Sequence, residues 1–134
     1  MSYRLAALAL FASLPTLPAQ AEPMPFATPS GDVECRLTSG SLDCSVFDLA
    51  VPLSGKGPRE CGSDWGHRYV LLSEGPVHLI CGGPAGRAAR QDIAPYGISA
   101  NWGPIRCTSD PGGLMCHNAD GHGFVLARDA VGVF

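Results

Sequence analysis

Charged side chains are scarce in this sequence and mixed in sign. Lys and Arg together number 9, and Asp and Glu number 12, among 134 residues, which gives a formal net charge of −3. There is no basic run that would bind the phosphates of a nucleic acid or an anionic membrane surface. We therefore expect no nucleic acid and no membrane among the partners of the mature chain.

Long helices and the common catalytic motifs are also missing. Beyond residue 21, no long segment has helical periodicity, and no apolar run approaches the roughly 20 residues of a membrane span. A phosphate-binding Gly loop is excluded, because such a loop is followed by a helix and no long helix is predicted here. The absence of Cys-x-x-Cys and Gly-x-Ser-x-Gly disfavours thiol exchange and a serine nucleophile. We expect no cofactor, while paired carboxylates remain open because their spacing is spatial.

Residues 1–21 have the three parts of a cleavable secretory signal peptide. Arg4 supplies the positive n-region, and residues 5–14 form an apolar h-region that is too short to span a membrane. Pro15 ends this run, and Ala19-Gln20-Ala21 has the small-x-small pattern that signal peptidase recognises. The pattern predicts export and cleavage after Ala21.

Removal of this leader leaves residues 22–134 (134 − 21 = 113 residues), which we expect to form one domain near the size at which covalent staples help. Loss of Arg4 takes the net charge from −3 to −4. All six cysteines lie in this mature part, and an even count in an exported chain is typical of a disulfide framework. We predict a periplasmic or secreted location, and the sequence does not choose between the two.

The first two cysteines lie in a predicted β-hairpin. Residues 33–37 and 42–46 alternate apolar and polar with period two, around turn residues. Folding about Ser39-Gly40 places Cys35 opposite Cys44, within disulfide range, and puts the apolar residues on one face. The opposite, solvated face takes Glu34, Arg36, Asp43 and Ser45.

The last two cysteines repeat this arrangement. Residues 105–109 and 114–118 flank Asp110-Pro-Gly-Gly113, and folding about this turn places Cys107 opposite Cys116. Two cysteines are then left for each other. The predicted disulfides are Cys35–Cys44, Cys61–Cys81 and Cys107–Cys116.

The remaining mature chain reads as further short strands and loops. Strand-like runs occupy residues 67–72, 77–80, 124–128 and 131–134, and residues 84–92 have the composition of one helical turn. The total is about seven or eight short strands. This pattern predicts an all-β fold, a small disulfide-stapled β-sandwich or barrel that follows the cleaved signal peptide.

Two groups of side chains are candidates for a site. His117, Asp120 and His122 could hold zinc or copper, although a polar turn whose Asp and Asn bond the backbone is the simpler interpretation, and we expect no metal. Trp65 and Trp102 each precede a glycine, and they could anchor a partner or stack on a sugar. Packing against the core is the more frequent role of a Trp in a small β domain.

The sequence resembles a family of small exported bacterial proteins of unknown function. The matching residues are Pro29-Ser30-Gly31 with Cys35, Cys61 with Trp65-Gly66, Cys107-Thr-Ser109, Gly113-Leu114-Met-Cys116-His-Asn118, Gly121-His122-Gly123-Phe124, Leu126, Arg128 and Phe134. The chain departs from the pattern with Asp32 in place of Asn and Ala127 in place of Ser. The resemblance spans nearly all of the mature chain and supports the domain assignment, but it implies no activity.

Two classes of function remain open. The first is a non-catalytic binding or inhibitory domain that acts in the cell envelope or outside the cell, on an envelope or extracellular protein or a glycan. A rigid, stapled scaffold that presents loops suits this role. The alternative is a small secreted enzyme or metal-binding protein that uses His117, Asp120 and His122. We favour the first class, since no catalytic motif is present.

Overall fold

The computed structural model describes residues 12–16, 24–51, 53 and 57–134. Residues 12–16 have no regular secondary structure, and the rest of the predicted leader, with its cleavage site, lies outside the described residues. Apart from one 3-10 turn, η1 (Arg59–Cys61), the regular elements in these ranges are strands. No helix in the described part of the chain has the length and apolar character needed to cross a membrane.

The first sheet has six strands in the order β5-β4-β3-β2-β1-β6. These strands are β1 (Met24–Ala27), β2 (Val33–Thr38), β3 (Ser41–Val46), β4 (Arg68–Leu72), β5 (His78–Ile80) and β6 (Asp92–Ile93). Neighbouring strands are antiparallel, except that β6 runs parallel to β1. Two-residue β6 therefore forms one edge of this sheet.

The second sheet has five antiparallel strands in the order β11-β10-β9-β8-β7. These strands are β7 (Ser99–Trp102), β8 (Ile105–Asp110), β9 (Gly113–His117), β10 (Gly123–Ala127) and β11 (Ala130–Val133). Consecutive strands are neighbours throughout, so this sheet is a simple meander with β7 at one edge.

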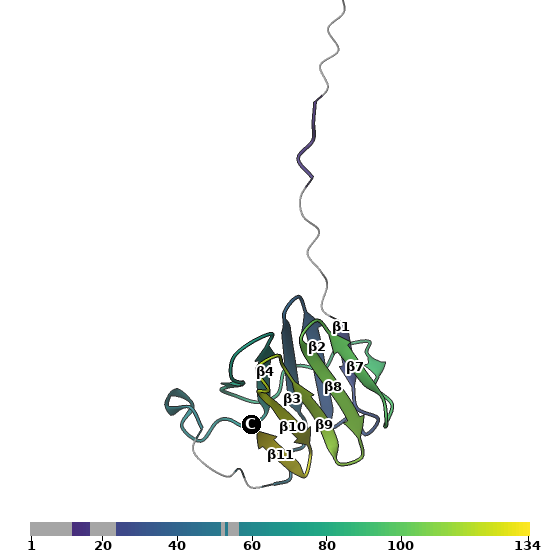
Figure 1. Ribbon diagram of the computed structural model, residues 1–134. Coiled ribbons are helices and arrows are strands. Elements are labelled where there is room, and N and C mark those ends of the chain that lie inside the picture. Colours follow the sequence, from purple (N-terminus) through teal and green to yellow (C-terminus); the bar gives the residue numbers. More distant parts are fainter. Residues whose placement is uncertain (1–11, 17–23, 52, 54–56) are drawn as a thin grey trace, which may run out of the picture.

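The two sheets pack face to face, with β8 and β9 in front of β2 and β3 in Figure 1. Their inner faces form one apolar core, to which both sheets contribute. The largest fully buried side chains include Leu42, Tyr69 and Leu71 from the first sheet and Ile105, Leu114, Phe124 and Leu126 from the second. The predicted all-β fold is confirmed, and of the two forms expected it is the sandwich.

Both predicted hairpins have the expected register. Cys35 pairs with Cys44 in β2–β3, and Cys107 pairs with Cys116 in β8–β9. These two disulfides have Cα–Cα distances of 4.0 and 4.1 Å, and the third joins Cys61 to Cys81. The four hairpin cysteines are buried in the core, so each cystine lies on the inner face of its sheet.

The structure departs from the sequence-based expectation in the number of strands. The described residues form eleven strands, where seven or eight were expected. The additional strands are β1, β6 and β7, which have 4, 2 and 4 residues. Strands this short carry too few residues for a period-two pattern, and their pairing with longer neighbours defines them.

The helical turn suggested for residues 84–92 is absent, because the backbone there bonds to side chains of the first sheet instead. The Ala85 N–H donates to Ser45 Oγ at 3.0 Å, and the Ala88 N–H donates to Glu34 Oε1 at 2.7 Å. Residues 84–88, which we call the strap, therefore cover the outer face of this sheet. Glu34 and Ser45 are buried, so the prediction of a solvated face is wrong for these two residues.

Tyr69 on β4 places a phenol in the centre of the sandwich. Its side chain is 1% exposed, and its hydroxyl donates to the Gly66 carbonyl at 2.8 Å. Burial raises the pKa of Tyr69 to about 12, because the phenolate would lose its hydration. The native core thus favours the neutral form of Tyr69.

We predict that Tyr69 makes stability fall in alkaline solution. Its folded pKa lies above the value of about 10 in unfolded chains, so its contribution is complete below pH 10 and is lost as pH rises towards 12. Urea unfolding with disulfides intact should show a loss of about 1 kcal/mol from this group between pH 10 and 11. The Tyr69→Phe protein should not show this loss. If the free energy of unfolding falls equally with pH in both proteins, the loss does not come from Tyr69.

Candidate functional site

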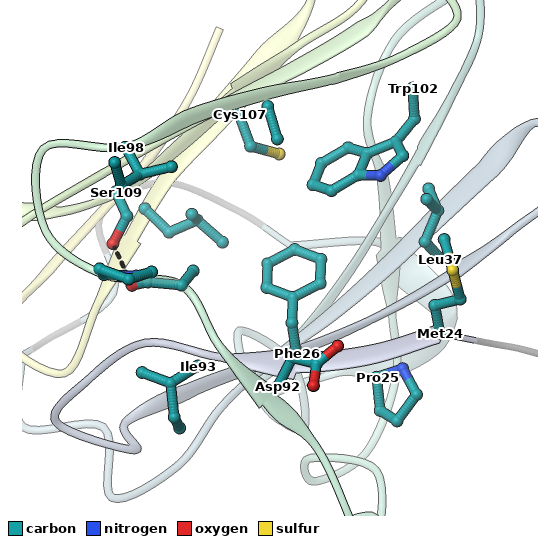
Figure 2. A pocket seen from close by; sticks show the side chains of 14 residues that line it. Met24, Pro25, Phe26, Leu37, Asp92, Ile93, Ile98, Trp102, Cys107 and Ser109 are labelled. Atoms are coloured by element: carbon teal, nitrogen blue, oxygen red, sulfur yellow. Dashed lines mark hydrogen bonds between the residues drawn. The ribbon is translucent and has the colours of Figure 1, made fainter.

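An apolar cleft opens between the two sheets at the edge where β1 and β6 of the first sheet face β7 of the second. Its volume is about 350 Å³. Figure 2 shows its lining side chains, which include Met24, Phe26, Leu37, Ile93, Ile98 and Trp102. We call this the edge cleft. Its floor is formed by residues of the hydrophobic core, since Leu114 and Cys107 also line it, and Cys107 is bonded to Cys116.

Two aromatic rings form the centre of the edge cleft. The rings of Phe26 and Trp102 stack, with centroids 5.4 Å apart and an angle of 23° between their planes. Phe26 lies on β1, with its side chain directed between the sheets, and Trp102 is the last residue of β7. Trp102 is only partly buried, so part of this aromatic surface is available to a ligand.

The mouth of the edge cleft is also apolar. Met24, Ile93 and Ile98 line it with 55, 53 and 55% of their surfaces exposed. Single exposed apolar residues are common on proteins, but a group around one opening is typical of a surface that binds something. Met24 and Phe26 lie on the same face of β1, so the exposed Met24 is next to the stacked rings, whereas Ile93 alternates with Asp92 and points to the other side of its strand.

Few polar side chains enter the edge cleft. Ser109 is 1% exposed, and its hydroxyl donates to the Ala94 carbonyl at 3.0 Å, so this group is already engaged. Asp92 is the other polar side chain among the described residues that line the cleft, and it is exposed. Asp92 is the register partner of Phe26 in the parallel β1–β6 pair, so both side chains face the same side of the sheet. The arrangement can hold an apolar group beside one carboxylate.

A second hollow of about 450 Å³ continues the edge cleft towards the end of the sandwich. The two share Met24, Leu37 and Trp102, and the second extends to Gly40 and Pro104 in the turns beyond. Together they form a continuous depression along β7, which we call the edge groove. Its lining suits an elongated ligand better than a spherical one.

A polar hollow of about 370 Å³ lies elsewhere, beside the β8–β9 turn and the end of β10. Its lining includes Asp32, Tyr96, Asp110, Arg128 and Asp129. The Asp110 carboxylate accepts the Gly112 N–H at 2.6 Å, as expected of a turn residue.

Across the residues that the structure describes, no three side chains of His, Cys, Asp or Glu are grouped closely enough to hold a metal ion.

The two tryptophans have different positions. Trp102 contributes to the edge groove, whereas Trp65 lies in the loop after η1 and outside the groove. The Trp65 ring packs against Gly57, where a Cβ atom would overlap the ring. The structure therefore places one of the two candidate aromatic residues at the cleft.

The segment from His117 to His122 is a polar turn between β9 and β10. The Asp120 carboxylate accepts the Gly75 N–H at 2.7 Å, so it contacts the β4–β5 turn of the other sheet. Asn118, which is 3% exposed, is the centre of the turn. Its side-chain amide donates to the carbonyls of Leu72 and Gly75 and accepts the N–H groups of Asp120 and His122, at 2.8–3.2 Å. The turn connects the two sheets.

Comparison with protein families identifies one match. A family of unknown function, DUF6636, matches residues 6–134. The chain belongs to this family. Comparison with curated proteins and with solved structures gives no match. The DUF6636 match begins within the predicted leader and extends to the last residue, so it includes every element of both sheets.

In this DUF6636 chain, residues that carry the resemblance noted in the sequence serve the framework. Gly66 accepts the Tyr69 hydroxyl, and Asn118 bonds the turns of both sheets. Gly123 has no room for a Cβ atom, which would overlap the Cys116 carbonyl oxygen, and Phe124 is fully buried. These positions explain how the sandwich is held together and do not point to a reaction.

Sequence reasoning found Trp102 but missed the other residues of the edge cleft. Phe26 and Asp92 lie on strands too short to have a recognisable pattern, and Ile93 and Ile98 flank an irregular segment. Their proximity depends on the parallel β1–β6 pairing, which joins residues far apart in the chain. The signal that the sequence offered is a pair of isoleucines, Ile93 and Ile98, on either side of Pro95 and Gly97.

We predict that Asn118→Ala is strongly destabilising, whereas His122→Ala is not. The first change leaves the carbonyls of Leu72 and Gly75 and two N–H groups without their partner, for an expected loss of about 2–4 kcal/mol in the free energy of unfolding. His122 is half-buried and should cost less than about 1 kcal/mol. Urea unfolding measures both values. Similar, small losses would contradict a framework role for the turn.

Proposed function

We propose that the protein is an exported, non-catalytic binding domain that acts in the cell envelope or outside the cell and holds an apolar part of its ligand in the edge cleft. The observation that carries this proposal is the stacked pair Phe26–Trp102 in an open apolar cleft. Ligand sites of this kind are concave and largely apolar, with few polar groups. A volume of about 350 Å³ is sufficient for a small apolar group or for side chains of a partner.

The lining chemistry favours binding over catalysis. Cys107 is oxidised, Ser109 is bonded to a carbonyl, and no His, Lys or Arg is among the described residues that line the edge groove. General acid–base or nucleophilic catalysis requires a reactive group beside a proton acceptor or donor. Asp92 alone does not supply such a pair.

The alternative, an enzyme or a metal-binding protein that uses His117, Asp120 and His122, has less support. Asp120 is engaged by the backbone of Gly75, and the turn that contains all three residues is built around Asn118. A glycan ligand is also less suitable for the edge cleft, because sugars need more hydrogen-bonding groups than this lining offers.

Export is supported by the leader pattern and by the disulfides. Three disulfides and no free cysteine in the described residues suit an oxidising compartment, where such bonds form and persist. They also hold the walls of the cleft, since Cys107 is one of its lining residues. A preorganised site binds at a lower entropic cost.

We predict that a bacterial host with a periplasm exports the full-length chain and cleaves it after Ala21. Mass spectrometry of the periplasmic fraction should find a protein that begins at Glu22 and has no free thiols. Ala19→Arg combined with Ala21→Arg should leave the leader attached, because the peptidase requires small residues there. Recovery of the uncleaved, reduced chain from the cytoplasm would contradict export.

We predict that the edge cleft binds Nile red, a neutral apolar dye, with a rise in dye fluorescence that saturates. Ala100→Leu fills the cleft and should weaken binding at least tenfold, since Ala100 lines it on β7. The matched control is Thr108→Leu, which adds an apolar side chain to a position outside the groove on β8. Equal binding by the two variants, or none by the parent protein, would refute this site.

A further inference from the structure

We infer that the edge groove binds an extended peptide segment of a partner protein, which adds as a strand to the free edge of β7. An apolar side chain of the peptide packs on Trp102 and Phe26, and a basic side chain lies at Asp92. This inference rests on the proposed function and names the ligand class of the same site. Three independent features support it: an unpaired strand edge, the shape of the groove and its single charge.

The unpaired edge belongs to β7. This strand is the last of its sheet, so in the described part of the chain one side of its backbone has no strand partner. Its sequence, Ser-Ala-Asn-Trp, has none of the charges or prolines that usually protect an edge strand. An extended peptide can therefore use these N–H and C=O groups, as in other cases of β-strand addition.

Within the ranges that the structure describes, the opposite wall of the groove is also a partly open strand edge. β6 pairs with only two residues of β1, Phe26 and Ala27, and leaves Met24 and Pro25 beyond its reach. Both of these residues line the edge cleft. The space between the sheets is thus bordered on both sides by strands that run along it.

The length and depth of the groove suit a short strand. β7 has 4 residues, so a peptide paired along it would extend for about 13 Å. Alternate side chains of that peptide point to one side, and those side chains can enter the apolar depression between Ile98 and Trp102. The groove continues to Pro104, so it has room for a further peptide side chain beyond the residues that pair with β7.

Charge selects the kind of peptide. Asp92 is the one charged side chain among the residues that line the edge groove, and no salt bridge to it is present in the described ranges. A basic group at the mouth is attracted to this carboxylate, whereas a fatty acid or another anion is repelled. An alkylamine would match the charge and the apolar wall but would leave the backbone of β7 unused.

The test uses blocked seven-residue peptides with Leu at positions 3 and 5, Thr at positions 2, 4 and 6, and either Lys or Glu at both ends. Binding is followed by the fluorescence of Trp102 in a Trp65→Phe protein, which has no other Trp. At low salt the Lys peptide should bind at least tenfold more tightly than the Glu peptide. Asp92→Asn should reduce this ratio to less than threefold, and the control Asp129→Asn should retain it.

Methylation of the Thr backbone nitrogens removes the donors needed for strand pairing and should weaken the Lys peptide at least tenfold. The inference is overturned if neither peptide binds, if the Lys and Glu peptides bind equally, or if methylation has no effect. It is also overturned if octylamine binds as tightly as the Lys peptide, since a small amphiphile is then the ligand. In each of these cases the Nile red result with Ala100→Leu still decides the proposed function separately.

Discussion

The structure depends on two disulfides that lie across the centres of its two facing hairpins. In β2–β3 and in β8–β9 the bonded cysteines are directly opposed, so each bond fixes the register of its hairpin. A slip of one residue would move every side chain to the other face and break the alignment of the two sulfurs. Each short loop closed in this way contributes about 2.5–3 kcal/mol in the chain-entropy description.

The sandwich that these disulfides hold together is closely hydrogen-bonded on one side and open on the other. Asn118 ties the β9–β10 turn to the β4–β5 turn, and the strap covers the outer face of the first sheet through Glu34 and Ser45. At the edge formed by β1, β6 and β7, the Ser109 hydroxyl bonds the Ala94 carbonyl, but no hydrogen bond between described residues crosses the gap beside Trp102. The edge groove is thus a consequence of where the sheets are joined.

The central hairpins could be predicted from the sequence because each pairing is local. Val33, Leu37, Leu42 and Val46 alternate with polar residues, and the turn residues fix the pairing, so face and register followed without the structure. The same local reasoning favoured a bonded polar turn at His117–His122, which the hydrogen bonds of Asn118 and Asp120 match.

The edge groove could not be predicted in the same way, because it arises from contacts between distant segments. The parallel pairing of Phe26 with Asp92 spans most of the domain, and two-residue β6 has no period of its own. Glu34 was misjudged for a similar reason, since its exposure was set by the strap rather than by its strand. Trp102 could be named as a candidate binding residue because it is a tryptophan, but nothing in the sequence marked its stacking partner Phe26.

The open groove and the disulfides are energetically related. Burying one Ile or Met side chain contributes about 1.5–3 kcal/mol, so leaving Met24, Ile93 and Ile98 about half exposed forgoes on the order of several kcal/mol. That loss is comparable to what one or two of the short disulfide loops contribute. A domain of this size would otherwise be only marginally stable with an exposed side to its core. The covalent bonds therefore permit the sandwich to keep apolar surface uncovered at the edge where a partner can cover it.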